Sequence, residues 1–498
     1  MKSRILSFRS AISVLAALAI PAGIAAQAQP QQATNPVPFL NQPLVPDAAG
    51  PGGLGFTLTV NGTGFVSDTK VNWNSSPLAT TFVSESQLTA TVPASNVATA
   101  GTASVTAVSP SPGGGTSNVA FFSVTSPAKI GLAKTDLATS GGDPEGEAVA
   151  DFNGDGKLDL VVANAGCCGF GPGNTLAVLL GNGDGTFQPA VLYATGDTPG
   201  WVAVGDFNGD GKMDLVTAND TTDGTVSILL GNGDGTFQAA VPYGAGMFPE
   251  TVIVADFNGD GKPDLVLANS KGGNTVSILL GNGDGTFDPP LSFATGIDPR
   301  QAITGDFNGD GKLDLATTNY NYGNGHTVSI LLGNGDGTFQ PHVDYPVGSG
   351  PFGITAADFN GDGKLDLAVT DGGFCCLASG LVSILLGNGD GTFQRAMSFH
   401  SGGSAPTRIA AADLNGYGQV DLAVTDISAN ILSVFPGDGH GNFGTPKNLN
   451  TRTRPVGILI ADFNGDGRLD LAVTASQADT VSVLLTTSVA LSTAKAGR

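Results

Sequence analysis

The sequence offers few residues other than aspartate for acid–base or metal chemistry. Only four of its 43 acidic residues are glutamate, and its four histidines lie at unrelated positions. It contains no GxSxG or HExxH motif and no phosphate-binding loop, so common signatures of hydrolases, zinc proteases and nucleotide-binding proteins are missing. Short motifs therefore do not identify the chain as an enzyme.

Cysteine is equally scarce, and its four copies form two adjacent pairs, Cys167-Cys168 and Cys375-Cys376. This spacing excludes a CxxC metal site. In an oxidising compartment the pairs can form two vicinal disulfides, remain free thiols, or cross-link the two loops that carry them. The sequence leaves these three arrangements open.

Basic residues are few as well, and the formal net charge is -22. Such a chain repels a phosphate backbone, so we expect no nucleic-acid partner. With 74 glycines and 29 prolines the chain is too rich in turns for a helical protein, and a hydrophobic content of 41% is too high for a disordered one. Composition therefore predicts an all-β fold with many short strands.

Only one long apolar run is present, from Ala11 to Ala26, and Pro21 interrupts it. Basic residues precede this run and small residues follow it, which is typical of a secretory signal peptide over residues 1–28. The alternative is a membrane anchor, which the short and broken run disfavours. We therefore expect an exported protein, extracellular or periplasmic, without a transmembrane anchor.

The next two segments differ in composition. Residues 29–45 are rich in Gln, Pro and Asn and are predicted to form a linker. Residues 46–126 contain short alternating strands between turn residues, which predicts a small β-sandwich. Residues 62–65 (GTGF) and 87–93 (QLTATVP) resemble IPT/TIG immunoglobulin-like domains. That resemblance implies an Ig-like spacer or binding module.

One unit, DFNGDGKLDL at Asp151 to Leu160, occurs seven times in related form. The later copies begin at intervals of 49 to 55 residues, at Asp206, Asp256, Asp306, Asp358, Asp413 and Asp462. Each repeat carries strand signals, and a GNGDGTF hairpin turn usually joins its last two strands. Four antiparallel strands in each of seven units predict a seven-bladed β-propeller over residues 127–486, with a tail at 487–498.

The seventh unit ends after its third strand, at residues 481–485, and lacks the GNGDGTF turn. Residues 129–140 precede the first unit with the spacing of a fourth strand. We predict that this segment completes the last blade, which closes the ring and removes two exposed strand edges.

Each repeat also places oxygen-bearing side chains at alternate positions. In the first copy Asp151, Asn153, Asp155 and Asp159 occupy positions 1, 3, 5 and 9, and Lys157 at position 7 can offer its backbone carbonyl. Oxygen donors in a flexible loop favour Ca²⁺ over zinc or octahedral magnesium. The alternative is that these loops are simply Asn-Gly and Asp-Gly turns, although turns alone do not require an acid at position 9.

The unit resembles the FG-GAP/VCBS repeat of integrin α-chain propellers, which implies calcium loops on a propeller. We predict about six calcium sites. Besides the first loop, the predicted ligands are Asp206, Asn208, Asp210, Lys212, Asp214; Asp256, Asn258, Asp260, Lys262, Asp264; Asp306, Asn308, Asp310, Lys312, Asp314; Asp358, Asn360, Asp362, Lys364, Asp366; and Asp462, Asn464, Asp466, Arg468, Asp470. Each Lys or Arg would bind through its carbonyl. The sixth copy has Tyr417 at position 5, so the site of Asp413, Asn415 and Asp421 is expected to be weak or empty.

The opposite face of the predicted propeller varies between repeats. Each repeat has a proline seven residues before its first loop aspartate, and the next two residues enter the inner strand, where the copies diverge. The divergent residues are Glu145, Trp201, Glu250, Arg300, Phe352 and Arg408. Trp201, Arg300, Phe352 and Arg408 are candidate ligand-binding residues. The alternative is a solvated rim without specific binding.

Glu147 is a further candidate, because the other six repeats place Val, Ala or Ile at its position. Two classes of function follow. The first is a noncatalytic, calcium-stabilised propeller that binds a glycan or protein ligand on the variable face, by analogy with integrin-type propellers and propeller lectins. The rival is a secreted polysaccharide-degrading lyase or hydrolase, with Glu145, Glu147 or Glu250 as acid or base and Arg300 or Arg408 holding a uronate.

A third class is a purely structural surface protein that neither binds a specific ligand nor turns one over. The sequence favours the noncatalytic binding protein. It leaves the identity of the ligand and the oligomeric state open.

Overall fold

The computed structural model describes residues 35–41, 44–46, 48–126, 129–166, 173–372 and 380–489. The predicted signal peptide and all four cysteines lie outside these ranges. Strands make up 51% of the structure and helices 2%, which confirms the predicted all-β class. Within the described ranges, no helix has the length and apolarity that a membrane crossing requires.

Residues 35–126 form a β-sandwich of two sheets around one hydrophobic core, which includes Leu58, Leu88, Val105 and Phe122. In β8 (Gly101–Ser109), alternate residues are buried, as expected for a strand with one face on the core. The first sheet contains β1 (Phe39–Leu40), β3 (Phe56–Thr63), β7 (Gln87–Val92) and β6 (Ala79–Ser84). The second contains β2 (Ala48–Ala49), β10 (Ala120–Val124), β8 (Gly101–Ser109), β4 (Lys70–Trp73), β5 (Ser76–Pro77) and β9 (Gly115–Thr116), and a short 3-10 helix spans Ala94–Val97.

Part of the predicted linker belongs to this sandwich. β1 pairs with β3, Asn35 bridges to Gly113, and Val45 bridges to Thr59. β1 and the two isolated bridges are too short to show an alternating pattern, so the sequence does not reveal these pairings.

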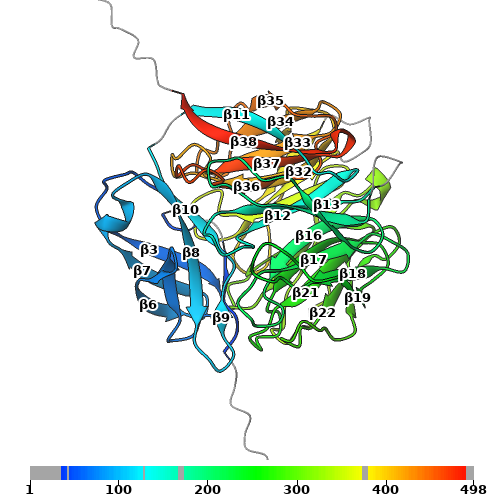
Figure 1. Ribbon diagram of the computed structural model, residues 1–498, viewed down its shortest axis with the longest axis horizontal. Coiled ribbons are helices and arrows are strands. Elements are labelled where there is room, and N and C mark those ends of the chain that lie inside the picture. Colours follow the sequence, from blue (N-terminus) through cyan, green and yellow to red (C-terminus); the bar gives the residue numbers. More distant parts are fainter. Residues whose placement is uncertain are drawn as a thin grey trace, which may run out of the picture. The chain divides into compact units, whose positions relative to one another are not determined.

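The repeat region forms seven antiparallel sheets of four strands each. Sheet 1 contains β12 (Pro144–Ala150), β13 (Asp159–Asn164), β14 (Thr175–Leu179) and β15 (Val191–Ala194). Sheet 2 contains β16 (Pro199–Gly205), β17 (Asp214–Asn219), β18 (Thr225–Leu229) and β19 (Val241–Gly244). Figure 1 labels strands from several of the seven sheets, such as β16, β17, β18 and β19. Sheet 3 contains β20 (Pro249–Ala255), β21 (Asp264–Asn269), β22 (Thr275–Leu279) and β23 (Leu291–Ala294).

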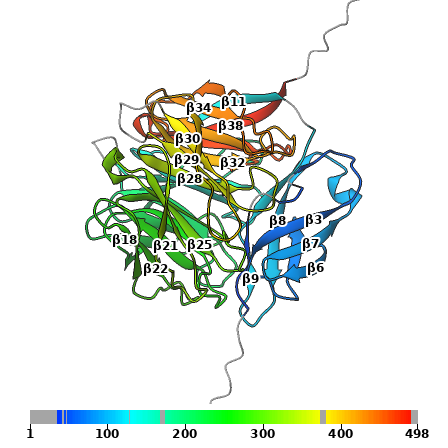
Figure 2. The same cartoon turned by 180° about the vertical axis from the view of Figure 1, so that it is seen from behind.

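The later sheets follow the same order. Sheet 4 contains β24 (Pro299–Gly305), β25 (Asp314–Asn319), β26 (Thr327–Leu331) and β27 (Val343–Pro346). Sheet 5 contains β28 (Pro351–Ala357), β29 (Asp366–Asp371), β30 (Leu381–Leu385) and β31 (Met397–His400), as Figure 2 shows for its first three strands. Sheet 6 contains β32 (Pro406–Ala412), β33 (Asp421–Asp426), β34 (Ile431–Phe435) and β35 (Lys447–Asn450). Sheet 7 contains β36 (Leu459–Ala461), β37 (Asp470–Ala475), β38 (Thr480–Val489) and β11 (Lys129–Ala138), and short 3-10 helices span Asn321–Gly323 and Ser476–Ala478.

The first strands of these sheets form a closed ring. Each contacts the first strand of the next sheet, and β36 contacts β12. The second strand of each sheet, such as β17, is buried along its whole length, because neighbouring sheets cover both of its faces. The fourth strands are largely exposed, as in β19. Repeated four-stranded sheets around a ring of inner strands are the architecture of a β-propeller.

Sheet 7 joins the two ends of the repeat region. β11 pairs with β38 over ten residues, from Lys129 opposite Val489 to Ala138 opposite Thr480 (Figures 1 and 2). Asp136 on β11 accepts hydrogen bonds from Arg452 at 2.7 Å and from Ser482 at 2.6 Å. β11 thus supplies the outermost strand within residues 129–140. Because β38 pairs with β11, β38 extends to Val489, three residues past residue 486, where the propeller was predicted to end.

Candidate functional site

The variable residues lie where the innermost strands begin. In sheets 1 to 6 the first strand starts at the repeat proline, and its pairing with the second strand shifts register within the next three residues. Such a bulge sets extra residues opposite one partner and re-aims their side chains. The local backbone therefore lets both positions after the proline carry large groups. The divergent residues that the sequence singled out at these positions, together with Glu147, are called the axial cluster: Glu145, Glu147, Trp201, Glu250, Arg300, Phe352 and Arg408.

Arg408 is central to this cluster. Its guanidinium carbon lies 4.7 Å from the ring centre of Trp201 and 4.9 Å from that of Phe352. The three residues come from sheets 6, 2 and 5, and Arg408 is only 6% exposed. A guanidinium next to two aromatic rings gains cation–π energy that grows as water is excluded. The structure thus brings together three predicted ligand-binding residues.

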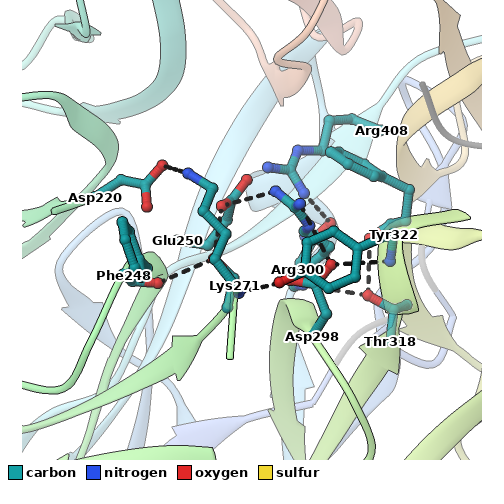
Figure 3. Close-up of polar contacts among 12 residues, drawn as sticks. Asp220, Phe248, Glu250, Lys271, Asp298, Arg300, Thr318, Tyr322 and Arg408 are labelled. Atoms are coloured by element: carbon teal, nitrogen blue, oxygen red, sulfur yellow. Dashed lines mark hydrogen bonds and ion pairs between the residues drawn. The ribbon is translucent and has the colours of Figure 1, made fainter. Parts of the chain in front are cut away.

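Arg300, the fourth candidate, is held differently. It forms ion pairs with Glu250 at 3.1 Å and with Asp298 at 3.4 Å (Figure 3). Its guanidinium lies 4.9 Å from the ring centre of Tyr320 and 5.8 Å from that of Phe352. Phe352 therefore lies beside both arginines, and it joins the group around Arg408 to the group around Arg300.

A second ion pair lies near Glu250. Lys271 pairs with Asp220 and lies 5.3 Å from the ring centre of Phe248, as Figure 3 shows. Burial by itself would raise the pKa of Glu250, but the charges of Arg300, Lys271 and Arg408 outweigh it and lower the pKa. Glu250 is thus ionised at neutral pH.

The two other glutamates behave in the opposite way. Burial, with smaller effects from Asp143 and Glu250, raises the pKa of Glu145 to about 8. Glu147 is 5% exposed, and neither of its carboxyl oxygens has a hydrogen-bond partner among the described residues. Burial raises its pKa well above the usual range. Both side chains are therefore largely protonated at neutral pH.

Glycines make room for the large side chains of the cluster. A Cβ on Gly457 would lie 1.9 Å from Oε2 of Glu147, and a Cβ on Gly146 would lie 2.7 Å from the Trp201 ring. Gly146 and Trp201 both stand two residues after their prolines, so glycine in one sheet faces a large residue at the same position of the next. Gly457 has the same position in sheet 7, but it faces Glu147, which lies one position later in its strand. The sequence reasoning missed these glycines, although their alternation with large residues at one repeat position is a usable signal. It also missed Gln301, Tyr320, Asp220 and Lys271, which only the folded contacts identify.

The predicted calcium loops form regular hydrogen-bonded turns. In the first loop the Asp151 carboxylate accepts hydrogen bonds from the backbone N–H groups of Gly154 and Gly156, each at 2.8 Å. Asn153 accepts from the N–H of Asp155, and Asp155 accepts from the N–H of Lys157, both at 2.9 Å. The remaining loops repeat most of this pattern, and Gly156 has the positive φ of 80° that its turn requires.

The aspartate at position 9 has a structural role in every copy. Asp159 is fully buried, and its two oxygens accept hydrogen bonds from the N–H groups of Phe152 and Gly181, both at 2.8 Å. Asp421 in the sixth copy makes the equivalent bonds with Leu414 and Gly437. In sheets 1 to 6 this acid ties the loop to the hairpin of the same sheet, and in sheet 7 Asp470 ties its loop to Thr486 of β38. Its recurrence therefore has a cause other than metal binding, contrary to the sequence argument that turns alone do not require it.

The residue types of the loops fit a hard cation, because carboxylate and amide oxygens recur at positions 1, 3 and 5. In the described part of the chain, however, no group of three or more Asp, Glu, His or Cys side chains is arranged to hold a metal ion. The sixth loop differs from the others because Asn415 donates a hydrogen bond to Asp421 at 2.8 Å. The four cysteines fall outside the described residues, so the structure does not address their pairing.

Family comparisons agree with the repeat pattern. A family model for the FG-GAP-like repeat matches residues 151–217, 206–267, 256–317, 318–369 and 413–473, which together make up more than half of the chain. An IPT/TIG domain model matches residues 43–124. A search of curated proteins found no match.

Several solved structures resemble the chain at low identity. An auxiliary nutrient binding protein from Bacteroides ovatus is 12% identical with a TM-score of 0.38, and the match covers 91% of this chain and 98% of that one. An auxiliary nutrient binding protein from Bacteroides thetaiotaomicron is 13% identical with a TM-score of 0.40, covering 91% and 98%. The periplasmic gluconolactonase of Pseudomonas aeruginosa is 15% identical with a TM-score of 0.46, covering 72% and 95%. Likenesses this distant carry no functional argument.

Proposed function

We propose that this chain, which belongs to the FG-GAP-like repeat family and carries an N-terminal IPT/TIG domain, is an exported, noncatalytic, seven-bladed propeller that binds a glycan or protein ligand at the axial cluster. One observation carries the proposal. Arg408, Trp201 and Phe352 are separated widely in sequence, yet they meet at the start of the innermost strands.

The scaffold itself does not require these side chains. At the same repeat positions other sheets have residues as small as Gly200, Thr251 or Gly457. Burying these aromatic and charged groups costs desolvation free energy, and the repeats do not share the contacts that the groups make. Such a cluster is typical of a binding site. Half-buried Trp201 and Arg300 keep part of it within reach of a ligand.

The rival, a polysaccharide-degrading enzyme, has one observation in its favour. Glycoside hydrolysis needs one carboxyl group that is protonated and one that is ionised. Glu145, with its raised pKa of about 8, and Glu250, with its lowered pKa, meet that requirement. However, Glu250 is engaged by Arg300 and by Ser270 at 3.3 Å, which leaves it poorly placed as a base.

A paired assay distinguishes the functions. Wild type and the variants Glu145→Gln, Glu147→Gln and Glu250→Gln are tested for turnover of a polysaccharide panel. Wild type, Trp201→Ala and Arg408→Gln are tested for binding to glycan and protein arrays, with the exposed Asp288→Asn as a matched control. We expect binding that is lost in Trp201→Ala or Arg408→Gln and no turnover. Turnover that a glutamate variant abolishes would establish the enzymatic function. If the protein neither turns over a polysaccharide nor binds a ligand on the arrays, a purely structural role is favoured.

We also propose calcium in the six intact loops, supported by their oxygen donors and by the flexible glycine turns. The sixth loop offers a matched test. Tyr417→Asp restores the missing carboxylate at position 5, whereas Asp362→Tyr removes the equivalent group from an intact loop. Calcium stoichiometry measured by equilibrium dialysis should rise by one in the first variant and fall by one in the second. Wild-type protein that binds no calcium at millimolar concentration would refute the assignment.

Export is the remaining part of the proposal. Amino-terminal sequencing of protein recovered from the periplasm or medium should show cleavage near residue 28. Protein that keeps its first residues and stays in the cytoplasm would contradict it.

A further inference from the structure

The two arginines of the axial cluster differ in how they are paired. Arg300 has two carboxylate partners, Glu250 and Asp298. Arg408 has none among the described residues. Its guanidinium donates a single hydrogen bond there, from Nη1 to the Gln301 side-chain oxygen at 3.2 Å. A guanidinium has five N–H donors, so most of those on Arg408 are not used by the protein residues described.

The carboxyl groups that act on Arg408 through their charges do not form ion pairs with its guanidinium. Glu145, Glu147 and Glu250 all act on it through their charges, yet none forms an ion pair with it. Glu250 is engaged by Arg300, and the two other acids are held largely protonated by burial. Among the described residues, Arg408 is therefore a buried cation without a direct anionic partner, which is a costly arrangement.

Two aromatic rings lie beside the Arg408 guanidinium. Trp201 and Phe352 are within cation–π distance of its guanidinium carbon. The N–H groups lie at the guanidinium edge, where a planar carboxylate can accept two parallel hydrogen bonds. Half-buried Trp201 and Gln301 add an aromatic surface and an amide, which suit the C–H face and hydroxyl groups of a sugar.

We propose that the axial cluster takes the carboxylate of an acidic sugar, a uronate, at the unused N–H groups of Arg408. The proposal rests on the ligand-binding function above and names the class of ligand. A cationic ligand at Glu145 and Glu147 is the less favourable occupant, because Arg408 would repel it.

The proposal includes a pH dependence with a defined sign. The charged groups acting on Glu145 are Asp143, Glu250, Arg408 and Arg454, and those acting on Glu147 are Arg408 and Glu145, with the Thr474 hydroxyl nearby. When Glu145 ionises as pH rises through its pKa of about 8, its charge repels a carboxylate. Affinity for a uronate should therefore fall between pH 6 and pH 9, rather than stay constant.

Trp201 provides a direct readout, because the chain contains only two tryptophans. The full-length protein is labelled with 5-fluorotryptophan, and Trp73→Phe assigns the two fluorine resonances. The probes are galacturonate and glucuronate, with galactose and glucose as neutral counterparts, galactosamine as a cation and N-acetylaspartate as a non-sugar carboxylate. We expect the Trp201 resonance to shift with a uronate and much less with its neutral counterpart.

Variants then locate the binding group. Arg408→Gln should weaken uronate affinity by about tenfold or more, in line with the loss of a charged hydrogen-bond partner. Arg408→Lys, which keeps the charge without the planar fork, should also bind more weakly. Glu145→Gln should bind a uronate with a flatter pH profile than wild type, and the exposed Arg395→Gln should match wild type. Wild-type titrations test the ligand class even if an Arg408 variant fails to fold.

Several results would overturn the proposal: no shift with any uronate, equal shifts with neutral sugars, a stronger response to galactosamine, or a response confined to N-acetylaspartate. The failure of the ligand class is separable from the failure of the binding function. If arrays report neutral glycans whose binding Trp201→Ala abolishes, the axial cluster is still a binding site but its ligand is not anionic.

Discussion

Glu145→Gln gives the sharpest test of the electrostatics of the axial cluster. The pKa of this carboxyl rises from 4.5 to about 8 in the folded protein. An acid whose folded-state pKa is raised binds more protons when folded, so stability is lost as pH rises between these two values. Glutamine stays neutral at every pH and avoids that loss. The variant should therefore be more stable than wild type at pH 8 and equally stable near pH 4.5.

The magnitude follows from the size of the pKa shift. Each pKa unit corresponds to about 1.4 kcal/mol, so the full shift sets an upper limit of about 5 kcal/mol at pH 8. Glu145 is half-buried rather than fully buried, and water near it reduces the effect. We expect Glu145→Gln to gain roughly 1 to 3 kcal/mol at pH 8, or a few degrees in melting temperature.

Thermal unfolding followed by circular dichroism at pH 5 and pH 8, at fixed calcium concentration, measures this difference. Comparing variant with wild type at each pH cancels the titration of the loop aspartates. The control is Asp288→Asn, which removes an exposed carboxylate. A melting-temperature difference that is the same at both pH values, or a variant less stable at pH 8, would refute the reasoning.

Three further outcomes are expected. Glu147→Val, which restores the residue type of sheets 2 and 3, should raise the melting temperature at pH 8, because it removes a buried carboxyl that has no hydrogen-bond partner among the described residues; a lower melting temperature would show that the carboxyl is satisfied. Excess EGTA should lower the melting temperature, since each site saturated at a hundred times its Kd contributes about 2.7 kcal/mol; an unchanged value would argue against calcium. Deleting residues 129–140 should abolish cooperative unfolding of the propeller, because β38 loses its partner along ten residue pairs; a truncated protein that melts like the parent would refute this role.

The repeated aspartates show both the strength and the limit of pattern reading. The recurrence of the unit located all seven sheets, and the missing last turn pointed to residues 129–140 as the source of an outer strand. At position 9 the recurrence also has a structural cause that the pattern alone does not reveal. Asp159 and its equivalents accept two backbone hydrogen bonds that hold the loop to its hairpin, which is a sufficient reason for an acid at that position.

The short pairings outside the repeats were not predictable. β1 spans only two residues, and it forms because β3 presents unpaired backbone groups to it, not because its own sequence favours a strand. Likewise, the extension of β38 to Val489 depends on β11, which lies more than three hundred residues earlier in the chain. Neither feature leaves a local periodic signal.

The sequence by itself determined the class of fold, the repeat boundaries and the positions at which repeats differ, because strand, turn and glycine preferences are local and were repeated seven times. Only the tertiary structure decided what those differing positions do together. Ring closure sets Trp201 of sheet 2 and Phe352 of sheet 5 beside Arg408 of sheet 6. It also gives Arg300 its acidic partner Glu250 of sheet 3, while Arg408 has none among the described residues. Pairing and burial depend on distances between separate sheets, and those distances exist only in the folded ring.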